Sequence, residues 1–152
     1  MAKLVNNETG RGYTDVIILS SADLAAIAAA GGTKTIGIIP KGGGICSASI
    51  STSKTFVTAG TLTAVAPTGA VQVGITGTLG QHIASAVPPA TVDTAARFNS
   101  GAGWTTGIPK VIDIPTTAAI PVILSVAAGN YSALDGQIVI TLCIIDPVAS
   151  TL

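Results

Sequence analysis

Polar and apolar residues alternate along much of the chain with the two-residue period of a β-strand. In one clear case Val71, Val73 and Ile75 fall on one face, and Gln72 and Thr76 fall on the other. Such alternation is typical of half-buried antiparallel strands. Strands are also predicted at residues 14–19, 33–39, 45–52, 110–115, 120–126 and 137–145, and a hairpin is predicted over 55–65, around Ala59-Gly60.

The last predicted strand, residues 137–145, is apolar on both faces. One face carries Ile138, Ile140, Leu142 and Ile144, and the other carries Val139, Thr141, Cys143 and Ile145. A strand with this pattern is expected at the centre of a sheet or at a contact between subunits. We expect residues 130–136 to join it to the strand at 120–126 as a hairpin.

Two parts of the chain break the strand pattern. In residues 20–32, Ser21 is placed to cap a helix, Asp23 lies in its first turn, and Gly31 follows an Ala-rich run. These signals predict a helix of at most about nine residues, or a turn. Residues 78–109 are rich in Gly and Pro, and we interpret them as a long excursion with one or two short strands.

Several short strands separated by Gly- and Pro-rich turns predict an all-β fold. The expected architecture is an antiparallel, jelly-roll-like β-sandwich with at most one short helix. Residues 1–12 are polar and are predicted to be a flexible N-terminal arm, either disordered or ordered only on a partner. Residues 13–152 then form a single β-sandwich domain of ordinary size.

Charge is scarce: Asp, Glu, Lys and Arg make up 9% of the chain, against about 25% in ordinary soluble domains. A folded monomer of this mass exposes roughly 7000 Å², so there is about one charge per 500 Å². Either Ser, Thr and Gly solvate most of the surface, or another subunit covers much of it. The net charge is zero and the cations are scattered, which argues against nucleic-acid binding.

Neither a membrane span nor a signal peptide is expected. The best apolar candidate, residues 114–128, has 15 residues and two prolines, whereas a span needs about 18 continuous apolar residues. The first residues contain polar side chains where a signal peptide needs an apolar stretch.

The chain offers little material for catalysis. His82 is the single histidine, so any nucleophile or metal site would depend on it. Cys46 and Cys143 are interpreted as small buried hydrophobes rather than as a disulfide. No nucleophile elbow or phosphate-binding loop is present in the sequence. We therefore expect no enzyme, no cofactor and no metal, and we expect Trp104 in a core or an interface.

Three stretches carry a resemblance to a known class of proteins: RGYTDVIILSSADLAA (11–26), DTAARFNS (93–100) and YSALDGQIVITLCIID (131–146). With the polar start and the Thr-, Ala- and Gly-rich composition, this layout resembles the virion structural proteins of tailed bacteriophages. Within that class, the chain is most similar to capsid decoration or cement proteins.

This resemblance implies a β-sandwich that binds the outside of the major capsid shell, often as a homotrimer, and braces neighbouring capsomers. It also implies the major capsid protein as partner and a location on the virion surface after synthesis in the host cytoplasm. The N-terminal segment would contact a partner. The predicted contact residues are Asn6, Asn7, Arg11, Tyr13 and Trp104.

Two alternatives stay open at this point. The chain could be another phage component, such as a tail, neck or head-fibre base protein. It could also be a module that binds carbohydrate or a host surface through Trp104 and the 78–109 segment. An enzymatic function is the least favoured hypothesis, and it would require His82.

Overall fold

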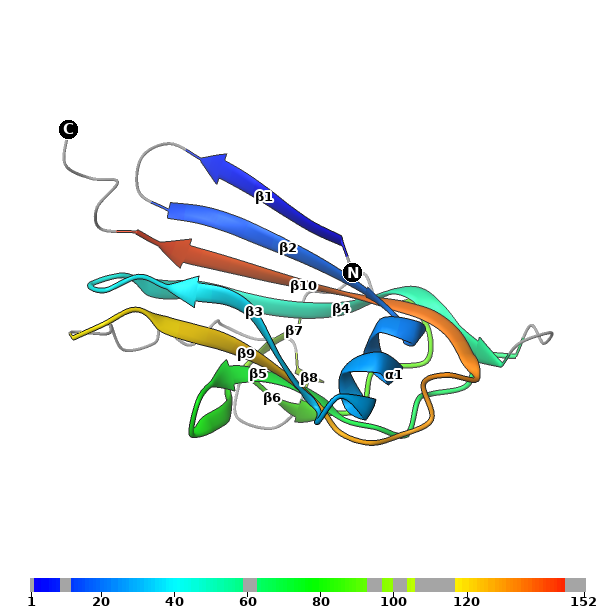
Figure 1. Ribbon diagram of the computed structural model, residues 1–152. Coiled ribbons are helices and arrows are strands. Elements are labelled where there is room, and N and C mark those ends of the chain that lie inside the picture. Colours follow the sequence, from blue (N-terminus) through cyan, green and yellow to red (C-terminus); the bar gives the residue numbers. More distant parts are fainter. Residues whose placement is uncertain are drawn as a thin grey trace.

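The computed structural model describes residues 2–8, 12–58, 63–92, 97–99, 104–105 and 117–146. These residues form two antiparallel sheets that pack face to face, with one short helix at one end (Figure 1). The six-stranded sheet has the order β1 (Ala2–Glu8), β2 (Gly12–Ser20), β10 (Leu134–Ile145), β4 (Gly44–Thr58), β7 (Arg97–Asn99) and β8 (Trp104–Thr105). The four-stranded sheet has the order β3 (Thr33–Ile39), β9 (Ile120–Val126), β5 (Val71–Ile75) and β6 (Thr78–Ala86). The prediction of an all-β sandwich is confirmed.

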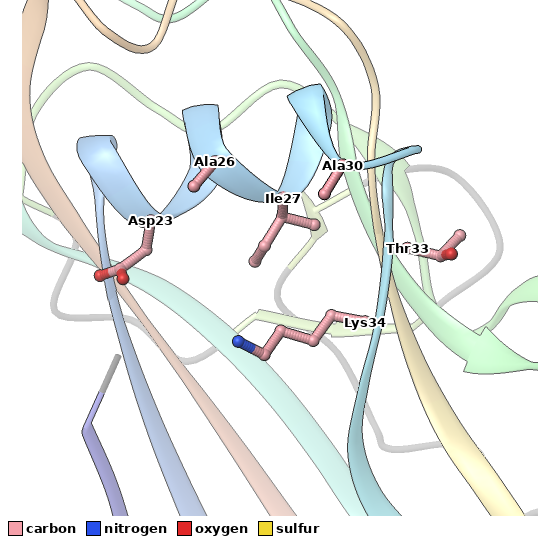
Figure 2. Close-up of a pocket in the computed structure, with 6 residues that line it drawn as sticks. All are labelled: Asp23, Ala26, Ile27, Ala30, Thr33 and Lys34. Carbon is pink, nitrogen blue, oxygen red and sulfur yellow. The ribbon is translucent and has the colours of Figure 1, made fainter.

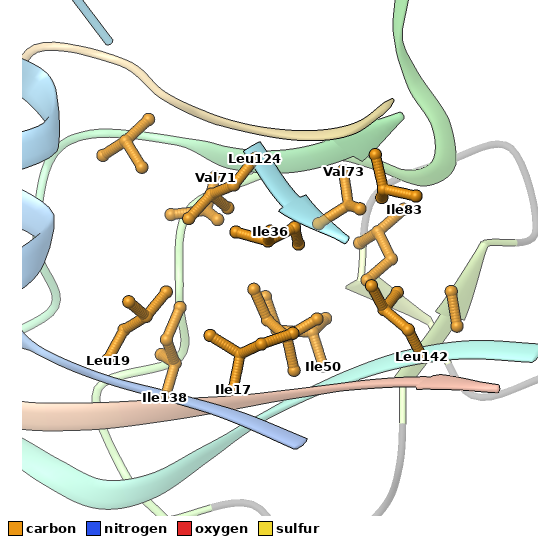
Figure 3. Packing of buried hydrophobic residues seen from close by; sticks show 14 of the residues in the cluster. Ile17, Leu19, Ile36, Ile50, Val71, Val73, Ile83, Leu124, Ile138 and Leu142 are labelled. Atoms are coloured by element: carbon orange, nitrogen blue, oxygen red, sulfur yellow. The ribbon is translucent and has the colours of Figure 1, made fainter. Parts of the chain in front are cut away.

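The core lies between the two sheets and consists almost entirely of aliphatic side chains (Figure 3). The six-stranded sheet contributes Ile17, Leu19, Ile50, Ile138, Ile140, Leu142 and Ile144. The four-stranded sheet contributes Ile36, Val71, Val73, Ile83, Val122, Leu124 and Val126. Fully burying one such side chain contributes about 1.5–3 kcal/mol, so this layer is the main source of stability.

Strand β10 is the centre of the larger sheet, as its two apolar faces predicted. It pairs with β2 without interruption, from Gln137 opposite Ser20 to Ile145 opposite Gly12. On its other side it pairs with β4. Its inward residues are buried, as predicted, and its outward residues are half-buried or exposed.

The helix α1 (Ser21–Ala29) covers one end of the sandwich, where it contacts β2, β10, β9 and β3 (Figure 1). Its cap is Ser20, one residue earlier than the predicted Ser21. The Asp23 backbone N–H donates to Ser20 Oγ at 3.2 Å, and the Ser20 backbone N–H donates to Asp23 Oδ2 at 2.9 Å. This capping box begins the helix, and Gly31, with a φ of 99°, follows its end.

The predicted hairpin over residues 130–136 is wrong, because β9 and β10 belong to different sheets. Each strand has one fully buried aliphatic face, and these faces meet each other across the core. The connection therefore arches between the layers. Tyr131 is completely buried in this arch, and the Leu134 backbone N–H donates to the Tyr131 carbonyl at 3.1 Å.

Residues 1–12 were predicted to be a flexible arm, but residues 2–8 form β1, the edge strand beside β2. Pairing runs from Ala2 opposite Ile18 to Glu8 opposite Gly12. Ladder hydrogen bonds use only the backbone, so a polar sequence can complete the edge of a sheet whose next strand is strongly apolar.

The middle of the chain contains more strand than expected. Strands β7 and β8 fit the short strands predicted within 78–109, but residues 78–86 form the nine-residue β6. Its alternation is interrupted because the successive residues His82 and Ile83 are both buried. Beyond β6 the chain returns to β4, where Thr52 Oγ1 donates to the Pro89 carbonyl at 2.9 Å.

Cys46 and Cys143, interpreted as separate buried residues, lie on neighbouring strands with Cα atoms 5.5 Å apart and form a disulfide. A register shift between Cys143 and Ile144 in the β10–β4 pairing allows this approach. The two cysteines are 97 residues apart in the sequence, and this separation did not indicate that they lie side by side. The predicted strand at 110–115 and the predicted turn at Ala59-Gly60 lie outside the described residues.

Candidate assembly surface

The outward surface of the six-stranded sheet is a candidate contact surface. We call it the outer face. It consists of Thr14, Val16 and Ile18 of β2, Val139, Thr141, Cys143 and Ile145 of β10, and Ser47, Ser49 and Ser51 of β4. All of these side chains are half-buried except Ile145, which is 44% exposed. The surface is therefore made mainly of Val, Ile, Thr and Ser.

The strand register aligns these residues into rows across the sheet. Thr141 of β10 is opposite Val16 on one side and Ser49 on the other. The backbone register continues this row to Leu4 on β1 and Phe98 on β7. Positions directly opposite one another share one side of a sheet, so the row crosses five strands.

Charge is excluded from the outer face. Among the described side chains of β2, β10 and β4, the charged groups nearest to the outer face are Lys54 and Asp135. They form an ion pair at one end of the sheet, with Nζ and Oδ2 2.7 Å apart. Both side chains are more than half exposed. Asp15 lies on the other side of β2, inside the sandwich, near the backbone of Gly37. A neutral surface of this kind is suited to packing against another protein surface.

The single histidine is buried inside the four-stranded sheet's edge strand. His82 of β6 is 2% exposed, and neither ring nitrogen has a hydrogen-bond partner among the described residues. Burial lowers the pKa of His82 to about 4. The ring is therefore neutral at physiological pH, and it is shut away from solvent rather than presented in a cleft.

The other buried titratable groups are also structural. Burial raises the pKa of Tyr131 to about 12, and its hydroxyl lies against Gly69 in the arch. Asp15 is fully buried on β2. Within the described part of the chain, no three His, Cys, Asp or Glu side chains come together as metal ligands would.

A small pocket lies between α1 and β3, with a volume of about 280 Å³ (Figure 2). Its walls are Asp23, Ala26, Ile27, Ala30, Thr33 and Lys34. The Asp23 carboxylate is already held by the Ser20 backbone and by Ser20 Oγ, the latter at 2.7 Å. Lys34 and Thr33 are thus the main polar groups available to a ligand, and these two exposed side chains do not define a substrate class.

The predicted contact residues are divided between the two edges of the six-stranded sheet. Asn6 and Asn7 lie on β1, and Tyr13 lies beside them on β2, with Asn7 directly opposite Tyr13. Trp104 lies on β8, at the opposite edge of the sheet. Arg11 is outside the described residues.

The outer face itself was only half visible in the sequence. The apolar second face of β10 and the serine face of β4 were both recognised as alternating patterns. Their union with Val16 and Ile18 depends on the order β2-β10-β4, which brings together segments more than 80 residues apart. No local signal specifies that order.

No protein-family model matches the chain, and no curated protein matches it. Among solved structures, it is similar to a chain of the structure described as "Cyanophage Pam1 capsid asymmetric unit". The identity is 19% and the TM-score is 0.43, over 96% of this chain and 94% of that chain. A similarity of this degree does not establish a shared function. In the described part of the chain, no helix has the length and hydrophobicity that crossing a bilayer requires.

Proposed function

We propose that this protein is a structural component of a tailed-phage virion that binds the outside of the capsid and cements neighbouring capsomers. Its partners are the major capsid protein and further copies of itself, as a homotrimer. It acts on the virion surface after synthesis in the host cytoplasm. The observation that carries the proposal is the uncharged outer face, which spans the central strands of the six-stranded sheet.

The chemistry of the described residues supports this role. A subunit that braces a shell needs extended neutral surface on a rigid body, and it needs no nucleophile, base or cofactor. The one histidine is buried and neutral, and the buried Asp15 and Tyr131 lie within the sandwich. The resemblance of the sequence to capsid cement proteins points to the same role.

Contact with the shell is assigned to the end of the sheet where β1 meets β2. Asn6, Asn7 and Tyr13 gather there, and Arg11 lies between the two strands in sequence. Amide and guanidinium groups hydrogen-bond to a polar protein surface without requiring a charged partner. Trp104, at the far edge of the sheet, is proposed as a second contact.

The test uses heads of the parent phage that were assembled without this protein. Purified protein is added, and binding is measured by co-sedimentation. We expect saturable binding to heads and none to isolated tails, and weaker binding for Arg11→Glu. The matched control is Lys34→Glu, which makes the same charge change beside α1 and should bind like wild type. Binding only to tails, or to neither particle, would contradict the cement role.

A further inference from the structure

We propose that the outer face of the six-stranded sheet is buried against other copies of this chain. This inference rests on the proposed function in one respect, because it identifies which surface joins the copies within the homotrimer. It can nevertheless fail on its own, since a monomer could still bind a shell through the β1–β2 end.

The first argument is the composition of the outer face. Val16, Ile18 and Val139 form an aliphatic group towards one end of the face, and Ile145 is exposed at the other end. Their neighbours on β4 are serines, whose small side chains allow a second surface to approach closely. Monomeric proteins rarely leave continuous surfaces of this kind open to water.

The second argument is area. Three strands spaced about 4.8 Å apart, over nine residues of about 3.3 Å each, give roughly 430 Å² for the surface of β2, β10 and β4. If this face covers an equal area on the next copy around the trimer, each contact buries about 860 Å² in total. Specific, stable protein contacts begin at roughly 1,200 Å². The face therefore supplies a large part of the area of such a contact, and neighbouring surfaces must supply the rest.

The third argument is charge. A charge buried in a contact needs a partner of opposite charge, whereas an uncharged surface can be covered by another copy without one. The described side chains of the outer face are uncharged, and the Lys54–Asp135 pair at its border is neutral as a unit. Charge remains elsewhere on the described surface, at Asp23, Lys34 and Lys41. This distribution favours another copy over a charged partner.

The test is the mass of the protein in solution, measured by light scattering over a wide range of concentration. Thr141→Arg places a cation in the middle of the outer face. Ser125→Arg is the matched control, because Ser125 is half-buried on β9 in the four-stranded sheet, opposite Gln72. We expect wild type and Ser125→Arg to have three times the chain mass of 14.9 kDa, and Thr141→Arg to fall threefold to that mass.

A monomeric wild type, or a Thr141→Arg variant with the wild-type mass, would overturn the inference. Circular dichroism checks that each variant is folded, and Ser49→Glu on the same row replaces Thr141→Arg if that variant is not. Head binding separates the two proposals. A monomer that binds heads removes the inference and leaves the cement role, whereas an oligomer that does not bind heads removes the cement role alone.

Discussion

The two sheets of the sandwich share one core but differ in what they present to the outside. The six-stranded sheet presents Val, Ile, Thr and Ser in aligned rows. The four-stranded sheet presents Gln72, Ser125 and the exposed Thr35 together with Ile123. Both sheets bury one aliphatic face equally well, so the core does not account for the difference. The difference lies in the outward surfaces alone, and it is the basis of the proposal that other copies cover the larger sheet.

The sheets also differ in where their strand register is interrupted. Strands β2 and β10 pair through nine consecutive positions, whereas β10 and β4, in the same sheet, shift register three times. In the four-stranded sheet the β5–β6 pairing shifts register twice. At Gly74 a Cβ atom would overlap the Thr78 carbonyl oxygen, so only glycine allows these strands to approach so closely. Bulges bend a sheet locally, so the uninterrupted β2–β10 pair is the most regular part of the outer face.

The largest expected effect comes from the inward side of β10. Ile140 is fully buried, so Ile140→Ala should lower the free energy of unfolding by about 2–5 kcal/mol through lost burial and a cavity. Urea unfolding at low protein concentration measures this. Thr141→Ala, the next residue on the opposite face, should cost less than about 1 kcal/mol. Equal losses would mean that the two faces of β10 are not distinct.

The second effect tests the four-stranded sheet through His82. In the unfolded chain its pKa is 6.5, and in the fold burial lowers it to about 4. The unfolded state therefore binds a proton first as pH falls. The contribution of His82 to the free energy of unfolding is therefore fully present above pH 6.5. It decreases as the pH falls towards 4, by about 3 kcal/mol in total.

His82→Phe should remove this part of the pH dependence, measured as urea unfolding at a series of pH values. The carboxylates titrate in both proteins, so the difference between the two curves isolates the histidine. Parallel curves for variant and wild type between pH 6.5 and 4 would show that His82 is accessible and that the edge of this sheet is open.

A smaller effect concerns the helix that covers one end of both sheets. Ser20→Ala removes the acceptor for the Asp23 backbone N–H and should lower the free energy of unfolding by about 1 kcal/mol. Ala22→Ser, the reverse exchange at an exposed position in the first turn, is the control and should be nearly neutral. Thermal unfolding of both variants measures this effect. A Ser20→Ala variant as stable as the wild type would contradict the capping box.

The smallest effect is expected at the border of the outer face. Lys54 and Asp135 are more than half exposed, so their ion pair is screened by solvent, and Lys54→Ala should change stability by less than about 1 kcal/mol. The oligomer mass should also stay unchanged, because the pair lies at the end of the face. Dissociation of this variant in light scattering would place the contact at the end of the sheet instead.

Much of this fold was predictable because strand periodicity is local. The strands at 14–19, 33–39, 71–75, 120–126 and 137–145 were predicted from alternation, and the helix from Asp23 and its flanking residues. The errors arose where partners are distant in sequence. Pairing with β2 turns residues 2–8 into a strand, and packing across the core turns the 130–136 connection into an arch. The outward patterns of β10 and β4 were each predictable from the sequence. Their union into one outer face was not, because it depends on the strand order.

The central claim is that copies of this chain cover the outer face and leave the other sheet to solvent. The most direct measurement is methyl NMR of the wild-type protein with a soluble paramagnetic agent. Val139 and Ile18 on the outer face and Ile123 on the four-stranded sheet are all half-buried in the single chain. The account predicts that the agent broadens the Ile123 methyl signals and spares those of Val139 and Ile18. Equal broadening of all three would contradict it.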